Sequence, residues 1–97
     1  MTIAKQTPNE LTLFIKKTEK YLDQVVENGS DQELFIASYL QGHFAVAAGQ
    51  SQVRKMTQVT QLNDLMETSL DAAFDNNELD KNDQHQVLKL WQTLLAD

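Results

Sequence analysis

Apolar side chains recur every three or four positions through most of the chain, which is the spacing that gathers them on one face of an α-helix. In the first segment they fall within an arc of about 140° on a helical wheel, and charged residues such as Lys16 and Glu27 lie opposite. The apolar positions of this segment are Leu11, Phe14, Ile15, Tyr21, Leu22, Val25 and Val26. No segment alternates with a period of two residues, so no strand is predicted.

Helix start and stop signals bound this first segment. Residues Thr7-Pro8-Asn9-Glu10 form a T-x-x-E capping box with proline at the first helical position. Asn28-Gly29 predicts an end in the left-handed conformation. The first helix is therefore expected between these two signals.

A second capping box, Ser30-Asp31-Gln32-Glu33, opens a helix that we expect over residues 31–48, with Gly49 ending it. This helix is apolar on more than one side. The main apolar arc consists of Ile36, Ala37, Leu40, Phe44, Ala47 and Ala48, and a second side carries Phe35, Tyr39 and Val46. A helix with such a pattern is either central in its domain or in contact with a partner.

Two more helices complete the predicted fold. The third is capped by Ser51 or Thr57, and its apolar face consists of Met56, Val59, Leu62, Leu65, Met66, Ser69, Leu70, Ala73 and Phe74. Turn-forming residues follow at 75–79, and Asp80 caps a last helix whose core face is Val87, Leu88, Trp91, Leu94 and Leu95. Short connections favour antiparallel neighbours, so we predict an all-α, single-domain, up-and-down antiparallel four-helix bundle over residues 7–97. Residues 1–6 are expected to form a mobile tail.

Composition narrows the range of functions. The 97 residues include no cysteine, which excludes disulfides and thiolate chemistry, and 8 basic against 14 acidic side chains give a net charge of −6. Such a charge argues against a nucleic-acid partner, because binding to phosphates needs Lys and Arg. The N-terminus does not resemble a secretory signal and no apolar run is long enough for a membrane span. We therefore expect a cytoplasmic protein that does not bind membranes.

The sequence contains no pattern typical of a catalytic, metal or cofactor site. An EF-hand loop beginning at Asp75 would place Leu79 at position five, Asp80 where glycine is required and Gln86 where a bidentate glutamate belongs. The two histidines, His43 and His85, have no metal-ligand spacing on their helices. We predict no metal site, no cofactor and no catalytic residue.

One geometric feature of the second helix calls for an explanation. Ser38, Gly42, Ala45 and Gly49 follow one another at +4, +3 and +4 and form a strip of small residues. Glycine within a helix costs about 0.5–1 kcal/mol relative to alanine, so Gly42 suggests the close approach of another backbone. That backbone belongs either to another helix of the same bundle or to a partner. In the second case the surface consists of Phe35, Tyr39, Gly42, His43 and Val46.

The same helix carries a family resemblance. Asp31, Glu33, Leu34 and Phe35 make a D-x-E-L-F motif, which is followed by Y-L-x-G-H at Tyr39, Leu40, Gly42 and His43. With these motifs the chain resembles the YfcL-like family of small proteobacterial proteins. Glu78-Leu79, Asp83-Gln84 and Trp91 give a weaker match, and Asp80-Lys81 stand where the family's pattern has Ser-Pro. The resemblance implies a single-domain bacterial protein and brings no catalytic residues.

These observations favour a small, acidic, non-enzymatic helical interaction module that binds a protein partner, or itself as a homodimer, through the second helix. An alternative is a small-ligand binder or enzyme with a pocket around His43 and Tyr39, assisted by an acidic neighbour such as Glu33. A third hypothesis, regulation of a nucleic-acid-binding partner by charge mimicry, rests on the net charge alone.

Overall fold

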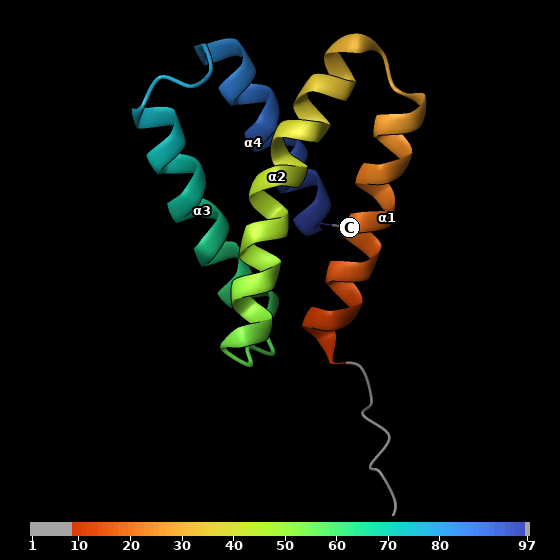
Figure 1. Ribbon diagram of the computed structural model, residues 1–97, viewed down its shortest axis with the longest axis vertical. Coiled ribbons are helices and arrows are strands. Elements are labelled where there is room, and N and C mark those ends of the chain that lie inside the picture. Colours follow the sequence, from red (N-terminus) through yellow and green to blue (C-terminus); the bar gives the residue numbers. More distant parts are fainter. Residues whose placement is uncertain (1–8, 97) are drawn as a thin grey trace, which may run out of the picture.

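A computed structural model describes residues 9–96 and shows four helices joined by short connections (Figure 1). The helices are α1 (Glu10–Asn28), α2 (Asp31–Val53), α3 (Val59–Asp75) and α4 (Lys81–Ala96). Their directions alternate along the chain, and no strand occurs among the described residues. The predicted all-α four-helix bundle is confirmed. The expected tail over residues 1–6 lies outside the described residues.

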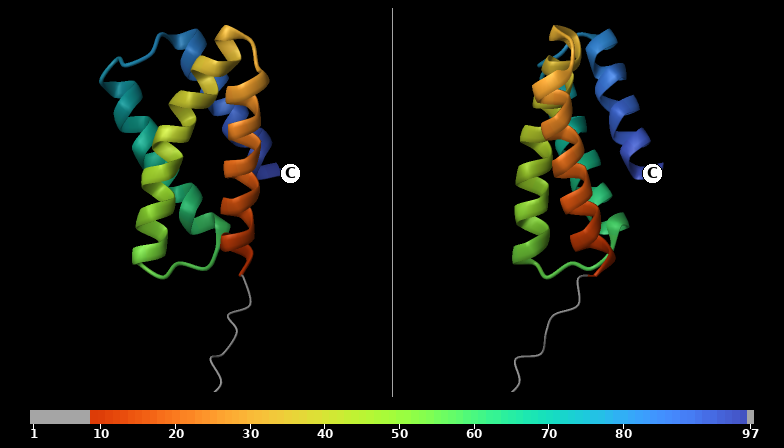
Figure 2. Two further views of the ribbon diagram at one scale, coloured as in Figure 1. Left: turned by 45° about the vertical axis from the view of Figure 1, so that its right-hand side comes forward. Right: turned by 90° about the vertical axis from the view of Figure 1, so that its right-hand side faces the viewer.

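The helix α2 is the centre of the domain. It packs against each of the other three helices, and α1 also packs against α3. The backbone of α4 comes closest to that of α2, and in the right-hand view of Figure 2 it stands apart from α1. Of the two alternatives for the second helix, a central place in its domain is therefore what the structure shows, although its outer side remains uncovered by the described residues.

The core is built around three aromatic rings from three helices. Phe14 of α1, Phe44 of α2 and Trp91 of α4 have ring centroids 5.9–6.4 Å apart in edge-on or tilted arrangements. The Trp91 indole N–H donates a hydrogen bond to Asn63 Oδ1 at 2.8 Å. This bond connects the aromatic cluster to α3, the remaining helix. Fully buried aliphatic residues surround it; they include Leu22, Leu40, Leu62, Met66, Leu70 and Val87. Burial of these predicted core faces stabilises the bundle.

Several predicted helix ends are confirmed. Ser30 and Glu33 form the expected capping box, with the Glu33 N–H donating to Ser30 Oγ at 3.2 Å and the Ser30 N–H donating to Glu33 Oε1 at 2.9 Å. Asp80 caps α4, because its carboxylate accepts a hydrogen bond from the Asp83 N–H at 2.8 Å. These short-range signals act locally, which is why the sequence reveals them.

The beginning and end of α1 differ from the prediction. The side chain of Asn9 caps this helix by accepting a hydrogen bond from the Thr12 N–H at 2.8 Å, while Thr7 and Pro8 lie outside the described residues. Gly29 has φ −79° and ψ 167°, so it is extended and not left-handed. Space explains the glycine: a Cβ atom at this position would lie 2.7 Å from the Val25 carbonyl oxygen.

The prediction for the end of α2 and the start of α3 is also wrong. Gly49 does not end α2, which continues for a further turn to Val53 and is followed by Lys55 at φ 56°. Ser51 lies in this last turn, where its buried hydroxyl donates to the Ala48 carbonyl at 2.7 Å. Gln58 occupies the N-cap position of α3, so neither Ser51 nor Thr57 does. The longer α2 extends its uncovered side.

Candidate interaction surface on the second helix

The side of α2 that points away from the bundle carries apolar and small residues. We call this set the outer face of α2; it consists of Phe35, Ser38, Gly42, Ala45, Val46, Gly49 and Val53, all of which are exposed. Phe35 is 45%, Val46 61% and Val53 83% exposed. Between Glu33 and Arg54 the sequence contains no Asp, Glu, Lys or Arg, so this helix lacks the charges that outward-facing sides usually carry.

The glycines of the outer face contact no other part of the described chain. A Cβ atom built on Gly42 or Gly49 would meet nothing within 4 Å beyond the helix itself. The interpretation that another helix of the same bundle approaches Gly42 is therefore wrong for residues 9–96. The reason is geometric: α1, α3 and α4 all pack on the opposite side of α2, around Leu40, Phe44 and Ala47.

Tyr39 and His43 lie at the edge of the outer face, where α2 meets α3. The Tyr39 hydroxyl donates a hydrogen bond to Glu78 Oε1 at 2.9 Å, and His43 Nδ1 lies 2.6 Å from Ser69 Oγ. The rings of Tyr39 and His43 are 4.9 Å apart. Both side chains thus have partners within the bundle and hold α3 and the connection after it against α2.

The environment of Tyr39 raises the pKa of its phenol to about 12. Partial burial is the largest cause, and the hydrogen bond to Glu78 together with its negative charge adds to the effect, because each of them disfavours the phenolate. A phenol with this pKa stays protonated at neutral pH. Tyr39 therefore keeps the proton that it donates to Glu78, in the connection after α3.

The acidic partner of Tyr39 differs from the one that the sequence suggested. Glu33 lies on another side of α2, where hydrogen bonds from the Ser30 N–H and the Ser30 side chain lower the pKa of its carboxyl group. Glu78, which follows α3, takes the expected place beside Tyr39. Nothing in the sequence pairs positions 39 and 78, because the packing of α2 against α3 brings them together.

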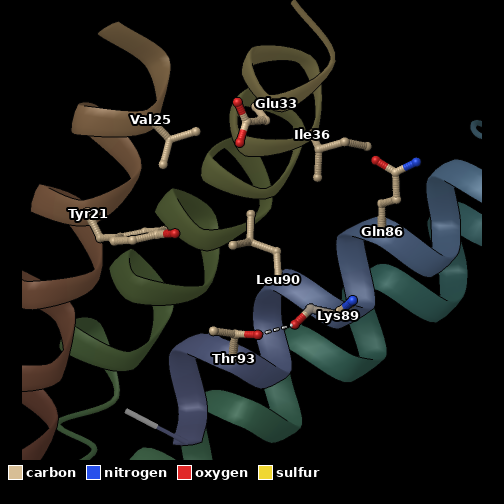
Figure 3. Close-up of a pocket in the computed structure, with 8 residues that line it drawn as sticks. All are labelled: Tyr21, Val25, Glu33, Ile36, Gln86, Lys89, Leu90 and Thr93. Carbon is tan, nitrogen blue, oxygen red and sulfur yellow. Dashed lines mark hydrogen bonds between the residues drawn. The ribbon is translucent and has the colours of Figure 1, made fainter. Parts of the chain in front are cut away.

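A hollow of about 380 Å³ lies between α1 and α4 and is lined by residues of α1, α2 and α4, with neither Tyr39 nor His43 among them (Figure 3). Its lining consists of Tyr21, Val25, Glu33, Ile36, Gln86, Lys89, Leu90 and Thr93. Tyr21 was expected on the core face of α1, but it is 40% exposed at the edge of this hollow. The structure thus separates Glu33 from the pair Tyr39 and His43.

The described residues also bear on a metal site, an EF-hand loop and a membrane span. Within residues 9–96, no three His, Asp or Glu side chains gather in a way that could hold a metal ion. Leu79 is only 8% exposed, so the segment tested above as an EF-hand loop points an aliphatic side chain into the core. No helix among the described residues has the length and apolar character that crossing a bilayer requires.

Comparison with known proteins agrees with the resemblance seen at α2. A model of the family described as "YfcL protein" matches residues 12–96, which is most of the chain. The chain belongs to the YfcL family. A protein of Escherichia coli (strain K12) with the name "Uncharacterized protein YfcL" is 30% identical over 73 residues, which cover 75% of this chain and 79% of that protein. No solved structure matches.

The residues of α2 that carry the family resemblance have different positions in the structure. Glu33 belongs to the capping box, Leu40 is fully buried, and Tyr39 and His43 form hydrogen bonds to the α3 side. Phe35 and Gly42 also carry the resemblance but lie on the outer face, where Gly42 contacts nothing beyond its own helix. The relative's name assigns it no activity.

Proposed function

We propose that this YfcL-family protein is a non-enzymatic interaction module that pairs with a second copy of itself through the outer face of α2. The observation that carries the proposal is Gly42, which stays in an exposed helix interior without any contact that requires it. Alanine there would stabilise the helix by about 0.5–1 kcal/mol, so the monomer alone gives no reason for glycine. Close approach of a second backbone gives one.

Exposed apolar side chains on both flanks of Gly42 support the proposal. Phe35 lies about two turns before it and Val46 one turn after it, and both expose a large part of their surface to water. From Phe35 to Val53 the outer face is about 27 Å long. Small residues at the centre would let two helices approach closely, while the larger side chains on either side would cover the contact.

Charge favours a second copy as the partner. The chain carries −6 in total, yet the outer face has no formally charged side chain between Glu33 and Arg54. A basic partner attracted by the acidic protein would leave its own charges without counterparts on this face. The same uncharged face on another copy matches it, and association would desolvate no ion.

The experiment that tests the proposal is sedimentation equilibrium of the full chain from micromolar to near-millimolar concentration. We expect a reversible dimer with weak affinity, because one pair of crossing helices buries less than the roughly 800 Å² per partner of a standard interface. The substitution Val46→Glu places a charge on the outer face and should leave only monomer. Leu13→Glu is the matched control: Leu13 of α1 is 57% exposed, close to the 61% of Val46, but lies outside the outer face.

Three results would contradict the proposal. Purely monomeric protein over the whole concentration range excludes self-association. A dimer that survives Val46→Glu, or that dissociates equally with Leu13→Glu, places the interface elsewhere. Circular dichroism of each variant has to show unchanged helix content, since an unfolded variant says nothing about the interface.

A further inference from the structure

A groove runs along the side of α1 that faces α4. Three hollows of about 380, 200 and 370 Å³ lie next to one another, since Tyr21 lines all of them, and together we call them the groove. The first is lined by α1, α2 and α4, the second by the middle of α1 and Leu94, and the third by the end of α1, Gly29 and Glu33. The first hollow alone, at about 380 Å³, is within the size range of small-molecule sites.

The packing of α4 leaves this groove open. Near its lower end the two helices meet through Phe14 and Trp91, whose ring centroids are 5.9 Å apart. Away from this contact, α4 packs more closely on α2 than on α1. The apolar side chains of Val25, Ile36 and Leu90 point into the space between the helices, and the ring of Tyr21 extends over it (Figure 3).

The charges around the groove differ from those of the rest of the protein. Lys17 and Lys20 of α1 and Lys89 of α4 line it, against Glu33 as the single acidic lining residue of the three hollows. Within residues 9–96, neither Lys20 nor Lys89 forms an ion pair. In a chain with a net charge of −6, Lys20 and Lys89 beside one lining glutamate make these hollows less negative than the chain as a whole.

The hollows differ in their charged residues. Lys20 lines the hollow at the Leu94 end, whose lining contains no acidic residue. Glu33 lines the other two hollows, and in the first of them the lining also includes Lys89 and apolar side chains. A ligand suited to this arrangement has an anionic head at the lysine end and an apolar tail that extends toward Ile36.

We propose that the groove between α1 and α4 binds a small amphipathic carboxylate, a free acyl chain with its carboxylate near Lys20. The tail lies on Val25, Ile36 and Leu90, where it loses contact with water. The head pairs with lysine and stays away from Glu33, which would repel it. The nine residue steps from Lys20 to Gly29 correspond to about 13 Å along the direction of α1, which an extended chain of about ten carbons covers.

The test is a titration of the ¹⁵N-labelled full chain with decanoate below its micelle concentration, followed by amide chemical shifts. We expect saturable shifts at residues of α1 and α4 that line the groove. Two further probes distinguish the contributions of the charged head and of the apolar tail to binding. Decylammonium has the same tail with the opposite charge, and acetate has the same head without the tail. Decanoate should bind about tenfold more tightly than decylammonium, and acetate should not bind detectably.

Matched variants check the contacting residues. Lys20→Gln combined with Lys89→Gln should weaken decanoate binding about tenfold and remove the preference over decylammonium. Lys16→Gln combined with Lys81→Gln removes the same charge outside the groove lining and should change affinity much less. Leu90→Gln, a half-buried position, should reduce the affinity of both chain-bearing probes.

The outcomes that overturn the proposal are distinct. Absence of saturable shifts with decanoate excludes this ligand class. Equal affinity for decanoate and decylammonium shows that the lysines select nothing. Shifts that cluster on the outer face of α2 instead of the groove show that the acyl chain covers a different apolar surface.

Discussion

Two glycines of this protein should respond to alanine with opposite signs. Gly42 lies within α2 and has open space around its Cα, whereas Gly29 lies in the tight connection between α1 and α2. Both have ordinary negative or helical backbone angles, since no glycine among the described residues has positive φ. The difference between them is therefore the space available to a methyl group, and each substitution tests one part of the structure.

Gly42→Ala should stabilise the monomer. The added methyl group meets no atom within 4 Å beyond the helix itself, so it creates no clash. The substitution restricts the unfolded chain and favours the helix, which together amount to about 0.5–1 kcal/mol. For a domain of this size, that change raises the melting temperature by about 2–8 °C.

Gly29→Ala should destabilise. Its Cβ would lie 2.7 Å from the Val25 carbonyl oxygen, 3.0 Å from Glu33 Cβ and 3.2 Å from Val25 Cγ1. The oxygen cannot move freely, because it accepts the Gly29 N–H at 2.7 Å. Relieving such contacts typically costs about 1–3 kcal/mol, which exceeds the gain from a less flexible unfolded chain.

Urea unfolding followed by circular dichroism, at concentrations low enough to keep the protein monomeric, measures both free energies of unfolding. Gly49→Ala is the control for Gly42→Ala, because Gly49 also has open space around it. Destabilisation by Gly42→Ala in the monomer would refute the reasoning, since it would mean that some part of the chain packs against the outer face. Stabilisation by Gly29→Ala would refute the described α1–α2 connection.

Three further predictions concern pH and the core. The lowered pKa of Glu33 stabilises the folded protein above the ordinary value near 4.5, and this stability is lost as the pH falls through the lower pKa of the folded state. Glu33→Gln, which keeps the cap, should make acid unfolding less steep when it is followed by circular dichroism. The raised pKa of Tyr39 gives stability that is complete below pH 10 and is lost as the pH rises through about 12. In a Tyr21→Phe variant Tyr39 is the remaining tyrosine, so ultraviolet titration should show its ionisation near pH 12. A pKa near the ordinary value of 10 would contradict the contact with Glu78. Leu40 is fully buried, so Leu40→Ala should lower the free energy of unfolding by about 2–5 kcal/mol in urea, and a loss below 1 kcal/mol would place this residue outside the core.

Helix boundaries illustrate how far local signals reach. Ser30, Glu33 and Asp80 cap their helices by hydrogen bonds to backbone groups three residues away, and the sequence predicted all three. The predicted helix end at Gly49 was wrong. Glycine is common at helix ends, but a helix continues through a glycine when the residues after it pack against the core. Here Ser51 is buried, which keeps the last turn of α2 in place.

Three of the five residues of the predicted surface lie on the outer face of α2, whereas Tyr39 and His43 lie at its edge and have partners within the bundle. Phe35, Gly42 and Val46 were recognised as one side of the second helix, and the structure shows them uncovered by the described residues. Val53 was missed because the helix was expected to end before it. The absence of charge from residue 34 to residue 53 is the sequence signal that could have indicated an uncharged outer face of this length.

The sequence by itself determined the number and type of the helices and the core face of each, since apolar period and caps depend on residues within one or two turns. Only the tertiary structure decided which helix each side of α2 meets. It placed Glu78 beside Tyr39 and opened the groove beside Tyr21, because such contacts join positions far apart in the chain. The periodicity of α2 left two sides available for packing, and the arrangement of α1, α3 and α4 covers just one of them.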